Sequence, residues 1–142
     1  MEVKIKKLKP SAVIPSYAKP GDAGMDLTAT SINYDEKGNY IYGTGLAIEV
    51  PEGHVALIFP RSSNRKTEAY MTNHVGVIDS GYRGEIMVTF KNRDAELHKA
   101  PYSLNDRIAQ MIIIPYPIIE LKEVEELSET ERGENGHGST GK

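Results

Sequence analysis

The chain has 142 residues, a length that suits one domain, and 39% of them are hydrophobic, which is enough for a core. The absence of Cys excludes a disulfide framework and a thiolate metal site, and it fits a reducing compartment. A net charge of −3 argues against a broad basic surface for nucleic acid. No apolar run approaches the roughly 20 residues of a membrane span, and the N-terminus lacks the apolar stretch of a signal peptide. We therefore expect a soluble, cytoplasmic protein that binds neither nucleic acid nor membranes.

Short segments of alternating apolar and polar residues recur between the 13 Gly and 8 Pro residues. Such alternation is typical of strands that bury one face. It predicts strands around Val3–Ile5, Leu46–Val50, Ile86–Phe90 and Ile108–Ile114, and the short continuous apolar run Val55–Phe59 indicates another. In the last strand Gln110 shares a parity with Ile108 and Ile112, so strict alternation points its side chain into the core. Only Arg93–Lys99 resembles a short helix. We predict an all-β domain with a jelly-roll-like β-barrel fold.

The last part of the chain has a different composition. From Ser128 to Lys142 there is no Ile, Leu, Val, Met or aromatic residue, so no apolar burial can offset the entropy lost on ordering. Its glycines, with Arg132, Ser139 and Thr140, nevertheless suit a phosphate chain. Two interpretations remain, a disordered terminus or an arm that orders on a ligand. We divide the chain into a β domain at residues 1–127 and an arm at 128–142.

An acidic residue, Asp79, follows a Val-Ile strand end and precedes Ser80-Gly81, after which a second strand begins. This order predicts a β-hairpin with Asp79 at its bend. Asp often caps such a turn and does nothing else. The alternative is that Asp79 orients a water molecule for attack on a substrate.

Two other segments carry groups that suit phosphate oxygens. Arg61-Ser62-Ser63 follows an apolar strand and offers a guanidinium, hydroxyls and backbone amides, although a solvated basic turn has the same composition. Asn105-Asp106 indicates a turn before the strand that carries Arg107 and Gln110. A buried Gln requires partners, which structural pairing alone could supply. These features by themselves indicate a phosphoester or nucleotide site.

Five segments together resemble the five motifs of the trimeric dUTP diphosphatase (dUTPase) family, in the family's order and over residues 23 to 140. They are Ala23-Gly24-Met25-Asp26-Leu27, Pro60-Arg61-Ser62-Ser63, Gly76-Val77-Ile78-Asp79-Ser80-Gly81-Tyr82-Arg83-Gly84, Asp106-Arg107-Ile108-Ala109-Gln110, and Arg132-Gly133 with Gly136-His137-Gly138-Ser139-Thr140. The resemblance implies a jelly-roll homotrimer whose three active sites are each assembled from three subunits, with the C-terminal arm closing over the site. It implies hydrolysis of dUTP to dUMP and pyrophosphate, which supplies dUMP for dTTP synthesis and keeps uracil out of DNA.

The resemblance also implies roles for single residues. Asp79 would orient and deprotonate the water that attacks the α-phosphorus, with Gln110 and Asp26 as further catalytic residues. Asp26 would contact, through water, a Mg²⁺ ion that the triphosphate chelates. Tyr82 would pack on the deoxyribose and leave no room for a 2′-hydroxyl. Arg107 would support the site. The other implied substrate-binding residues are Arg61, Ser62, Ser63, Gln110, Arg132, Gly138, Ser139 and Thr140 for phosphates, and Asn73, Val77, Ile78, Met87 and a stacking His137 for uracil, in a hairpin too narrow for a 5-methyl group.

The chain departs from the family's usual pattern in three places. The second motif usually continues Ser-Gly-Leu-Ala, whereas this chain has Ser62-Ser63-Asn64-Arg65, which bears on local packing and subunit contact. Asn105 replaces the usual Gly of the fourth motif, and Asn tolerates a positive φ better than most residues. His137 replaces a frequent Phe and can still stack on a base.

Two alternatives share the predicted fold. One is a dCTP deaminase-like enzyme, which Arg61-Ser62-Ser63 resembles slightly more closely. That enzyme requires a glutamate as proton shuttle on the strand after the hairpin, and Ile86–Phe90 contains no acid. The other is a catalytically silent nucleotide-binding protein, which would not need Asp26 and Asp79 together with Gln110.

Overall fold

The computed structural model describes residues 1–136, and these form short strands joined by turns and loops. The elements, in chain order, are β1 (Lys4–Lys7), β2 (Met25–Thr28), β3 (Ser31–Tyr34), β4 (Asn39–Gly43), β5 (Leu46–Glu49), β6 (His54–Pro60), the 3₁₀ helix η1 (Ser62–Lys66), β7 (Ala69–Met71), β8 (Gly76–Ile78), β9 (Met87–Asn92) and β10 (Arg107–Pro115). Arg93–Lys99 forms bends and a turn, not the short helix that the sequence indicated.

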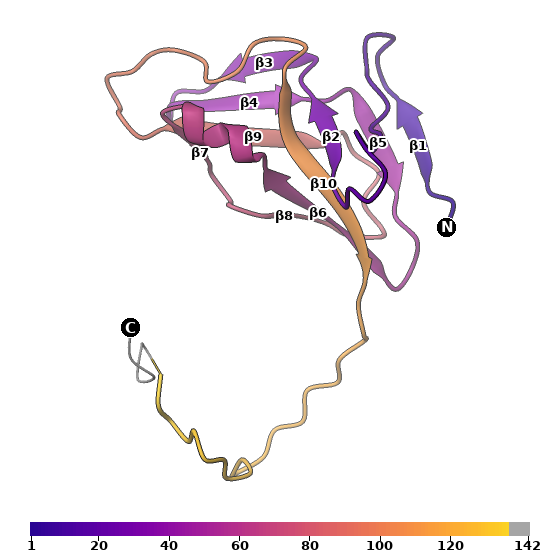
Figure 1. Ribbon diagram of the computed structural model, residues 1–142, viewed down its shortest axis with the longest axis vertical. Helices are drawn as coiled ribbons and strands as arrows, with labels where there is room; N and C mark the ends of the chain where they lie inside the picture. Colours follow the sequence, from indigo (N-terminus) through magenta and orange to yellow (C-terminus); the bar gives the residue numbers. More distant parts are fainter. Residues whose placement is uncertain (137–142) are drawn as a thin grey trace.

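The strands pair in two four-stranded sheets and one two-stranded sheet, all antiparallel (Figure 1). One large sheet has the order β2-β10-β6-β8, the other has the order β3-β4-β9-β7, and β1 pairs with β5. Consecutive strands therefore cross repeatedly between sheets, as in jelly rolls. The prediction of an all-β, jelly-roll-like domain is confirmed.

The core lies between the two large sheets. Ile58, Ile108 and Met111 face it from one sheet, and Tyr42 and Phe90 face it from the other. The rings of Tyr42 and Phe90 meet edge to face with centroids 5.9 Å apart, an arrangement that aromatic pairs favour. This packing gives the first large sheet a fixed inner face.

The outer face of the same sheet is amphipathic. Directly opposed residues share a face, so Ile112, Leu57 and Val77 form one outward row across β10, β6 and β8. The row beside it contains two polar residues, Asp26 and Gln110, and Phe59. The Val77 side chain is 60% exposed, so residues 1–136 leave most of it open to solvent.

The prediction that Gln110 points into the core is therefore wrong. A register irregularity lies between Arg107 and Ala109, and beyond it Ala109 and Met111 take the inward positions. Such bulges shift the parity of a strand, which simple alternation cannot anticipate. Gln110 and Ile112 consequently lie on the outer face and are half-buried.

The segment around Asp79 is a turn but not a hairpin. β8 pairs with β6, whereas β9 pairs with β4 and β7, so the strands on either side belong to different sheets. The Tyr82 N–H donates to the Asp79 carbonyl oxygen at 3.1 Å, which closes a tight turn. A second expectation on turns is met, because Asn105 has a φ of 69°.

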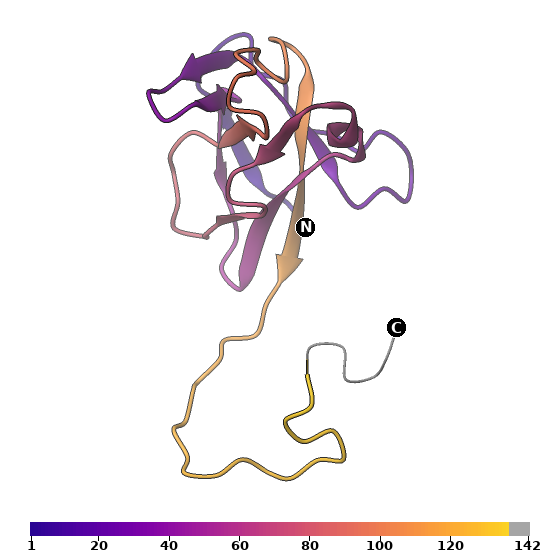
Figure 2. The same cartoon turned by 90° about the vertical axis from the view of Figure 1, so that its left-hand side faces the viewer.

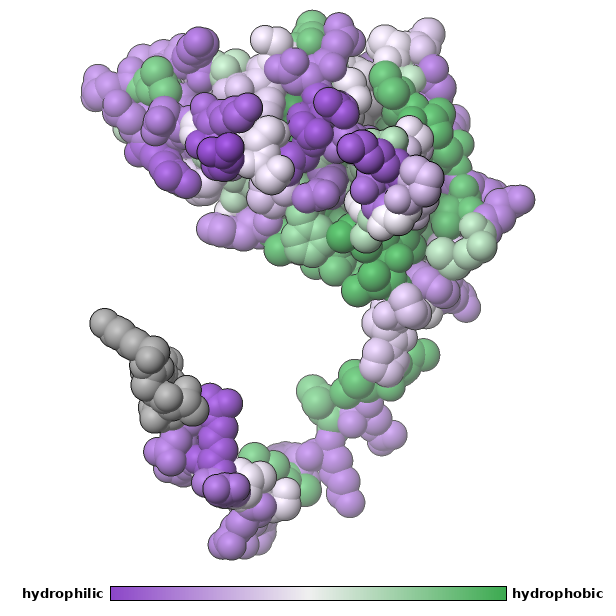
Figure 3. Space-filling model, in the orientation of Figure 1, coloured by the Kyte–Doolittle hydropathy of each residue, from purple (hydrophilic) through white to green (hydrophobic). Residues whose placement is uncertain are grey.

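After β10 the chain leaves the body of the molecule (Figure 2). Residues 116–136 are exposed throughout, and Ile118 and Leu121 are each 91% exposed. Figure 3 shows apolar atoms gathered on the body near the end of β10 and again along the segment that follows. The described part of the chain contains no helix long and apolar enough to cross a membrane.

Candidate active site

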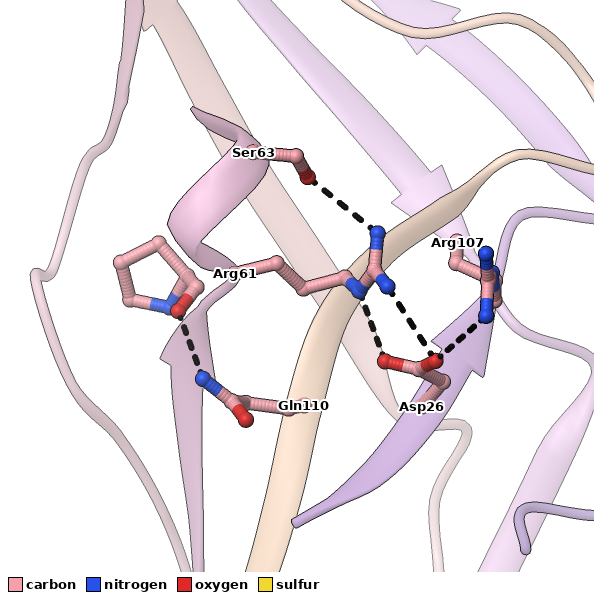
Figure 4. Close-up of polar contacts among 6 residues, drawn as sticks. Asp26, Arg61, Ser63, Arg107 and Gln110 are labelled. Atoms are coloured by element: carbon pink, nitrogen blue, oxygen red, sulfur yellow. Dashed lines mark hydrogen bonds and ion pairs between the residues drawn. The ribbon is translucent and has the colours of Figure 1, made fainter. Parts of the chain in front are cut away.

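A charged cluster centred on Asp26 lies where β2, β6 and β10 meet (Figure 4). Arg61 Nε donates to Asp26 Oδ1 at 2.7 Å, and Nη2 lies 3.3 Å from Oδ2. Arg107 Nη1 donates to the same Oδ2 at 3.1 Å. Arg61 Nη1 also donates to the Ser63 hydroxyl at 3.2 Å. One carboxylate thus orients two guanidinium groups and a hydroxyl on one surface.

Local sequence explains why these groups converge. Asp26 and Gln110 are directly opposed in the β2–β10 pair, so both side chains point to the outer face. Gln110 Nε2 donates to the Pro60 carbonyl oxygen at 3.1 Å, which leaves its amide oxygen directed away from that bond. A Cβ on Gly24 would lie 2.6 Å from Gln110 Oε1, so any other residue at position 24 would displace the Gln110 amide.

The cluster is suited to a polyanion. It contains two guanidinium groups and one carboxylate, and the side chains of Asp26 and Arg61 are only 22% and 24% exposed. Partly buried guanidinium groups bind phosphate oxygens strongly and with defined geometry. The phosphate-binding roles that the sequence predicted for Arg61, Ser63 and Gln110 stay predictions.

The same residues bear on a metal ion. No group of three or more His, Cys, Asp or Glu side chains able to hold a metal occurs within residues 1–136. Asp26 accepts one hydrogen bond at Oδ1 and two at Oδ2, so Oδ1 can accept another from a water molecule. This donor set fits a water-mediated contact with an ion that the substrate itself carries, and it does not fit a cage made by the protein.

A second group of predicted residues lines a pocket of about 220 Å³ around Asp79. Its lining residues are Val77, Ile78, Asp79, Tyr82, Glu85 and Met87. The Asp79 side chain is exposed. The Tyr82 hydroxyl donates to the Glu85 carbonyl oxygen at 2.9 Å, which fixes the ring across the pocket. A Cβ on Gly84 would collide with that ring, so the glycine is required.

Sequence reasoning missed Glu85. Its Oε1 accepts the Gly45 N–H at 2.7 Å, which ties the pocket to the turn between β4 and β5. Glu85 directly precedes Ile86, so its position beside the third motif was visible in the sequence.

The structure does not bring all predicted residues together. No hydrogen bond or ion pair among residues 1–136 joins the Asp26 cluster to the Asp79 pocket. Asn73 lies in the turn before β8, and Ser62 begins η1 with an exposed side chain. Among residues 1–136, Arg132 Nε donates to the nearby Asn135 carbonyl oxygen at 3.0 Å and to no other residue. The predicted contacts of His137, Gly138, Ser139 and Thr140 lie outside the described residues.

Comparisons with known proteins agree with this geometry. Residues 10–141 match the family model described as dUTPase. The chain is 43% identical to the deoxyuridine 5′-triphosphate nucleotidohydrolase of Corynebacterium glutamicum, over 99% of this chain and 95% of the relative. It is 41% identical to the enzyme of the same name from Crocosphaera subtropica, over 99% of each chain.

Solved structures give the same result. A variant dUTPase of Staphylococcus bacteriophage 80alpha, in complex with dUpNHpp, superposes with a TM-score of 0.84. It is 28% identical, and the match covers 99% of this chain and 98% of the phage chain. A variant dUTPase from phage phi11 of S. aureus, described as coordinating a structural Mg(II) ion, has a TM-score of 0.72 at 25% identity, with 89% and 98% covered. The chain belongs to the dUTPase family.

Proposed function

We propose a mechanism for the hydrolysis of dUTP to dUMP and pyrophosphate that this chain, as a dUTPase, catalyses. Asp79 accepts a proton from a water molecule, and the water oxygen attacks the α-phosphorus. The bond between the α-phosphorus and the bridging oxygen breaks, and pyrophosphate leaves with that oxygen. The single observation that carries this proposal is the exposed Asp79 carboxylate beside the Tyr82 ring in one pocket.

The pocket and the cluster divide the substrate between them. In the pocket, Tyr82 packs on the deoxyribose, while Val77, Ile78 and Met87 surround the uracil together with Asn73. In the cluster, Arg61, Ser62, Ser63 and Gln110 bind the phosphate chain, and Arg107 supports Asp26. Asp26 would hold, through water, a Mg²⁺ ion that the triphosphate carries, and the ion would neutralise part of the phosphate charge.

We propose that the protein is a homotrimer and that each active site is formed by residues of more than one chain. The pocket and the cluster are not bonded to each other within residues 1–136, yet hydrolysis requires both. The outward apolar row of Leu57 and Ile112 lies on the sheet face that also carries Asp26 and Gln110. A neighbour that covers this row would bring its own Asp79 pocket to the cluster. A closed ring repeats such a contact at every subunit.

We propose that the β domain spans residues 1–127 and that the arm at residues 128–142 closes over this site. Support comes from composition, because the arm carries donors for phosphate and no apolar residue for a core. Arg132, Gly138, Ser139 and Thr140 would bind the phosphates. His137 would stack on the uracil, a contact worth roughly 1–3 kcal/mol per base.

A complementation experiment tests the shared site. Asp79→Asn lacks the base, and Arg61→Ala lacks the phosphate clamp, so each variant alone should be almost inactive. When both are unfolded together and refolded, about a quarter of the sites combine an intact pocket with an intact cluster if these come from different chains. Recovery of pyrophosphate release near that fraction supports sharing. No recovery, with mixed trimers present by native mass spectrometry, would mean that each chain completes its own site.

A further inference from the structure

The side chain of Asn64 connects the phosphate-binding turn to the aromatic core. Its Oδ1 accepts the Tyr102 hydroxyl at 2.9 Å, and its Nδ2 donates to the Ala69 carbonyl oxygen at 3.1 Å. The Thr67 hydroxyl donates to the Asn64 carbonyl oxygen at 2.8 Å and lies 3.2 Å from Oδ1. The usual family residue at this position is leucine, whose side chain has no donor or acceptor to make these bonds.

Asn64 also closes the turn that presents the phosphate ligands. Its N–H donates to the Arg61 carbonyl oxygen at 2.9 Å, and this bond forms the first turn of η1. Ser63 lies between the two residues and receives the Arg61 Nη1 donor at 3.2 Å. Any movement of Asn64 therefore changes where Arg61 and Ser63 point.

Tyr102 anchors the other end of this connection. It is 8% exposed, and its ring packs on Phe90 with centroids 5.1 Å apart. The Tyr102 N–H donates to the Tyr42 hydroxyl at 3.0 Å, and that hydroxyl donates to the Tyr102 carbonyl oxygen at 3.0 Å. Burial raises the pKa of the Tyr102 hydroxyl, so it stays protonated and remains a donor at neutral pH.

We propose that Asn64 and Tyr102 are positioning residues for phosphate binding, acting through Arg61 and Ser63. They hold η1 against the core before the substrate arrives, so less conformational freedom is lost when the triphosphate binds. The inference rests on the phosphate-binding role proposed above for Arg61 and Ser63. It assigns a function to the Asn64 departure from the family pattern.

The test uses Tyr102→Phe and Asn64→Ala in the full-length protein. Tyr40→Phe is the matched control, because Tyr40 is also 8% exposed and its hydroxyl makes no hydrogen bond within residues 1–136. Binding of the non-hydrolysable analogue dUpNHpp and the steady-state kinetics with dUTP are measured for each. Tyr102→Phe and Asn64→Ala should each raise Kd and KM roughly 2- to 10-fold, the range for one lost hydrogen bond. The value of kcat should not change, because binding before and during the reaction weakens equally.

The same substitutions in an Arg61→Ala background separate positioning from general stability. If Asn64 and Tyr102 act through Arg61, replacing either of them in the Arg61→Ala variant should raise the Kd for dUpNHpp by less than about twofold. The inference is overturned if these substitutions raise Kd as much in the Arg61→Ala variant as in the wild type, or if Tyr102→Phe binds dUpNHpp as tightly as Tyr40→Phe. Either result leaves the proposed role of Arg61 intact. If Arg61→Ala by itself binds dUpNHpp as tightly as the wild type, the proposed role of Arg61 fails first.

Discussion

Arg61 and Asp26 form a two-point ion pair, with Nε 2.7 Å from Oδ1 and Nη2 3.3 Å from Oδ2. Arg107, on the neighbouring strand β10, donates to the same carboxylate. Asp26 therefore separates two positive charges as well as offering an oxygen to a metal-bound water. Removing the Asp26 charge should therefore weaken the binding of Mg²⁺ without weakening the binding of the nucleotide.

We predict that Asp26→Asn raises the Mg²⁺ concentration needed for half-maximal activity roughly tenfold, about the effect of one charge-assisted hydrogen bond. Binding of dUpNHpp without metal should not weaken, because both guanidinium groups remain and lose their internal competitor. Magnesium titrations of activity and metal-free calorimetry measure the two effects. Asp94→Asn, in an exposed loop, is the control. An unchanged Mg²⁺ dependence would remove Asp26 from the metal role.

Replacing Asp79 tests the base. Asp79→Asn should lower kcat by roughly 10²–10⁴, the usual effect of losing a general base. The melting temperature should not change, because the side chain is exposed and makes no hydrogen bond within residues 1–136. Pyrophosphate release and thermal unfolding measure both. Near-normal turnover in this variant would show that another group activates the water.

Sequence reasoning located most groups of the candidate site, because short motifs carry residue types at fixed positions. It could not predict which groups lie together. Asp79 and Asp26 each fall within a recognisable motif, but β8 and β2 are the two edge strands of one sheet, and only the strand order shows this. The hairpin expected at Asp79 was wrong for the same reason, since pairing between distant strands decided the topology.

Strand faces were also only partly predictable. Alternation located β10, but the bulge before Ala109 reversed the parity that placed Gln110 inside. The run Val55–Phe59 is apolar throughout and located β6, yet only Ala56 and Ile58 are fully buried. The apolar residues of the outer face, Leu57 and Ile112, would be covered by the subunit contact that we propose. Asn64 was noted as a departure, but its hydrogen bond to Tyr102 joins residues 38 positions apart.

The Tyr82 ring should select deoxyribose. Its hydroxyl donates to the Glu85 carbonyl oxygen, which holds the ring in the pocket. Tyr82→Ala should narrow the ratio of kcat/KM for dUTP over UTP, because the space for a 2′-hydroxyl opens. Tyr82→Phe should retain most of that ratio, since the ring remains. Competition between the two nucleotides measures it directly. Equal selectivity in wild type and Tyr82→Ala would exclude this role.

The core tyrosines should make the fold sensitive to alkali. Burial raises the pKa of Tyr42 to about 12, from an ordinary value of 10.0. Between these values the unfolded chain has lost the proton and the folded chain has kept it, so stability falls as pH rises through that range. Tyr42→Phe should flatten this fall. At pH 7 it should lower stability by roughly 1–3 kcal/mol, because the Tyr102 N–H loses its acceptor. Urea unfolding from pH 7 to 12 tests both effects, and parallel curves would exclude Tyr42 as a cause.

Two truncations should separate the roles of the C-terminal segment. A chain that ends at Glu131 loses Arg132 and the residues that follow, but it keeps the exposed apolar side chains after β10. It should keep its melting temperature and the mass of the proposed trimer while turnover falls sharply, because it loses the proposed phosphate donors and the stacking His137 but no core residue. A chain that ends at Pro117 also loses Ile118 and Leu121, which are each 91% exposed and would pack on a neighbour. This shorter chain should dissociate at higher protein concentrations than the longer one. Light scattering over a dilution series, with melting curves and dUTP turnover, distinguishes the two variants. A melting temperature that already falls in the longer variant without ligand would mean that the arm stabilises the fold and does not serve the site alone.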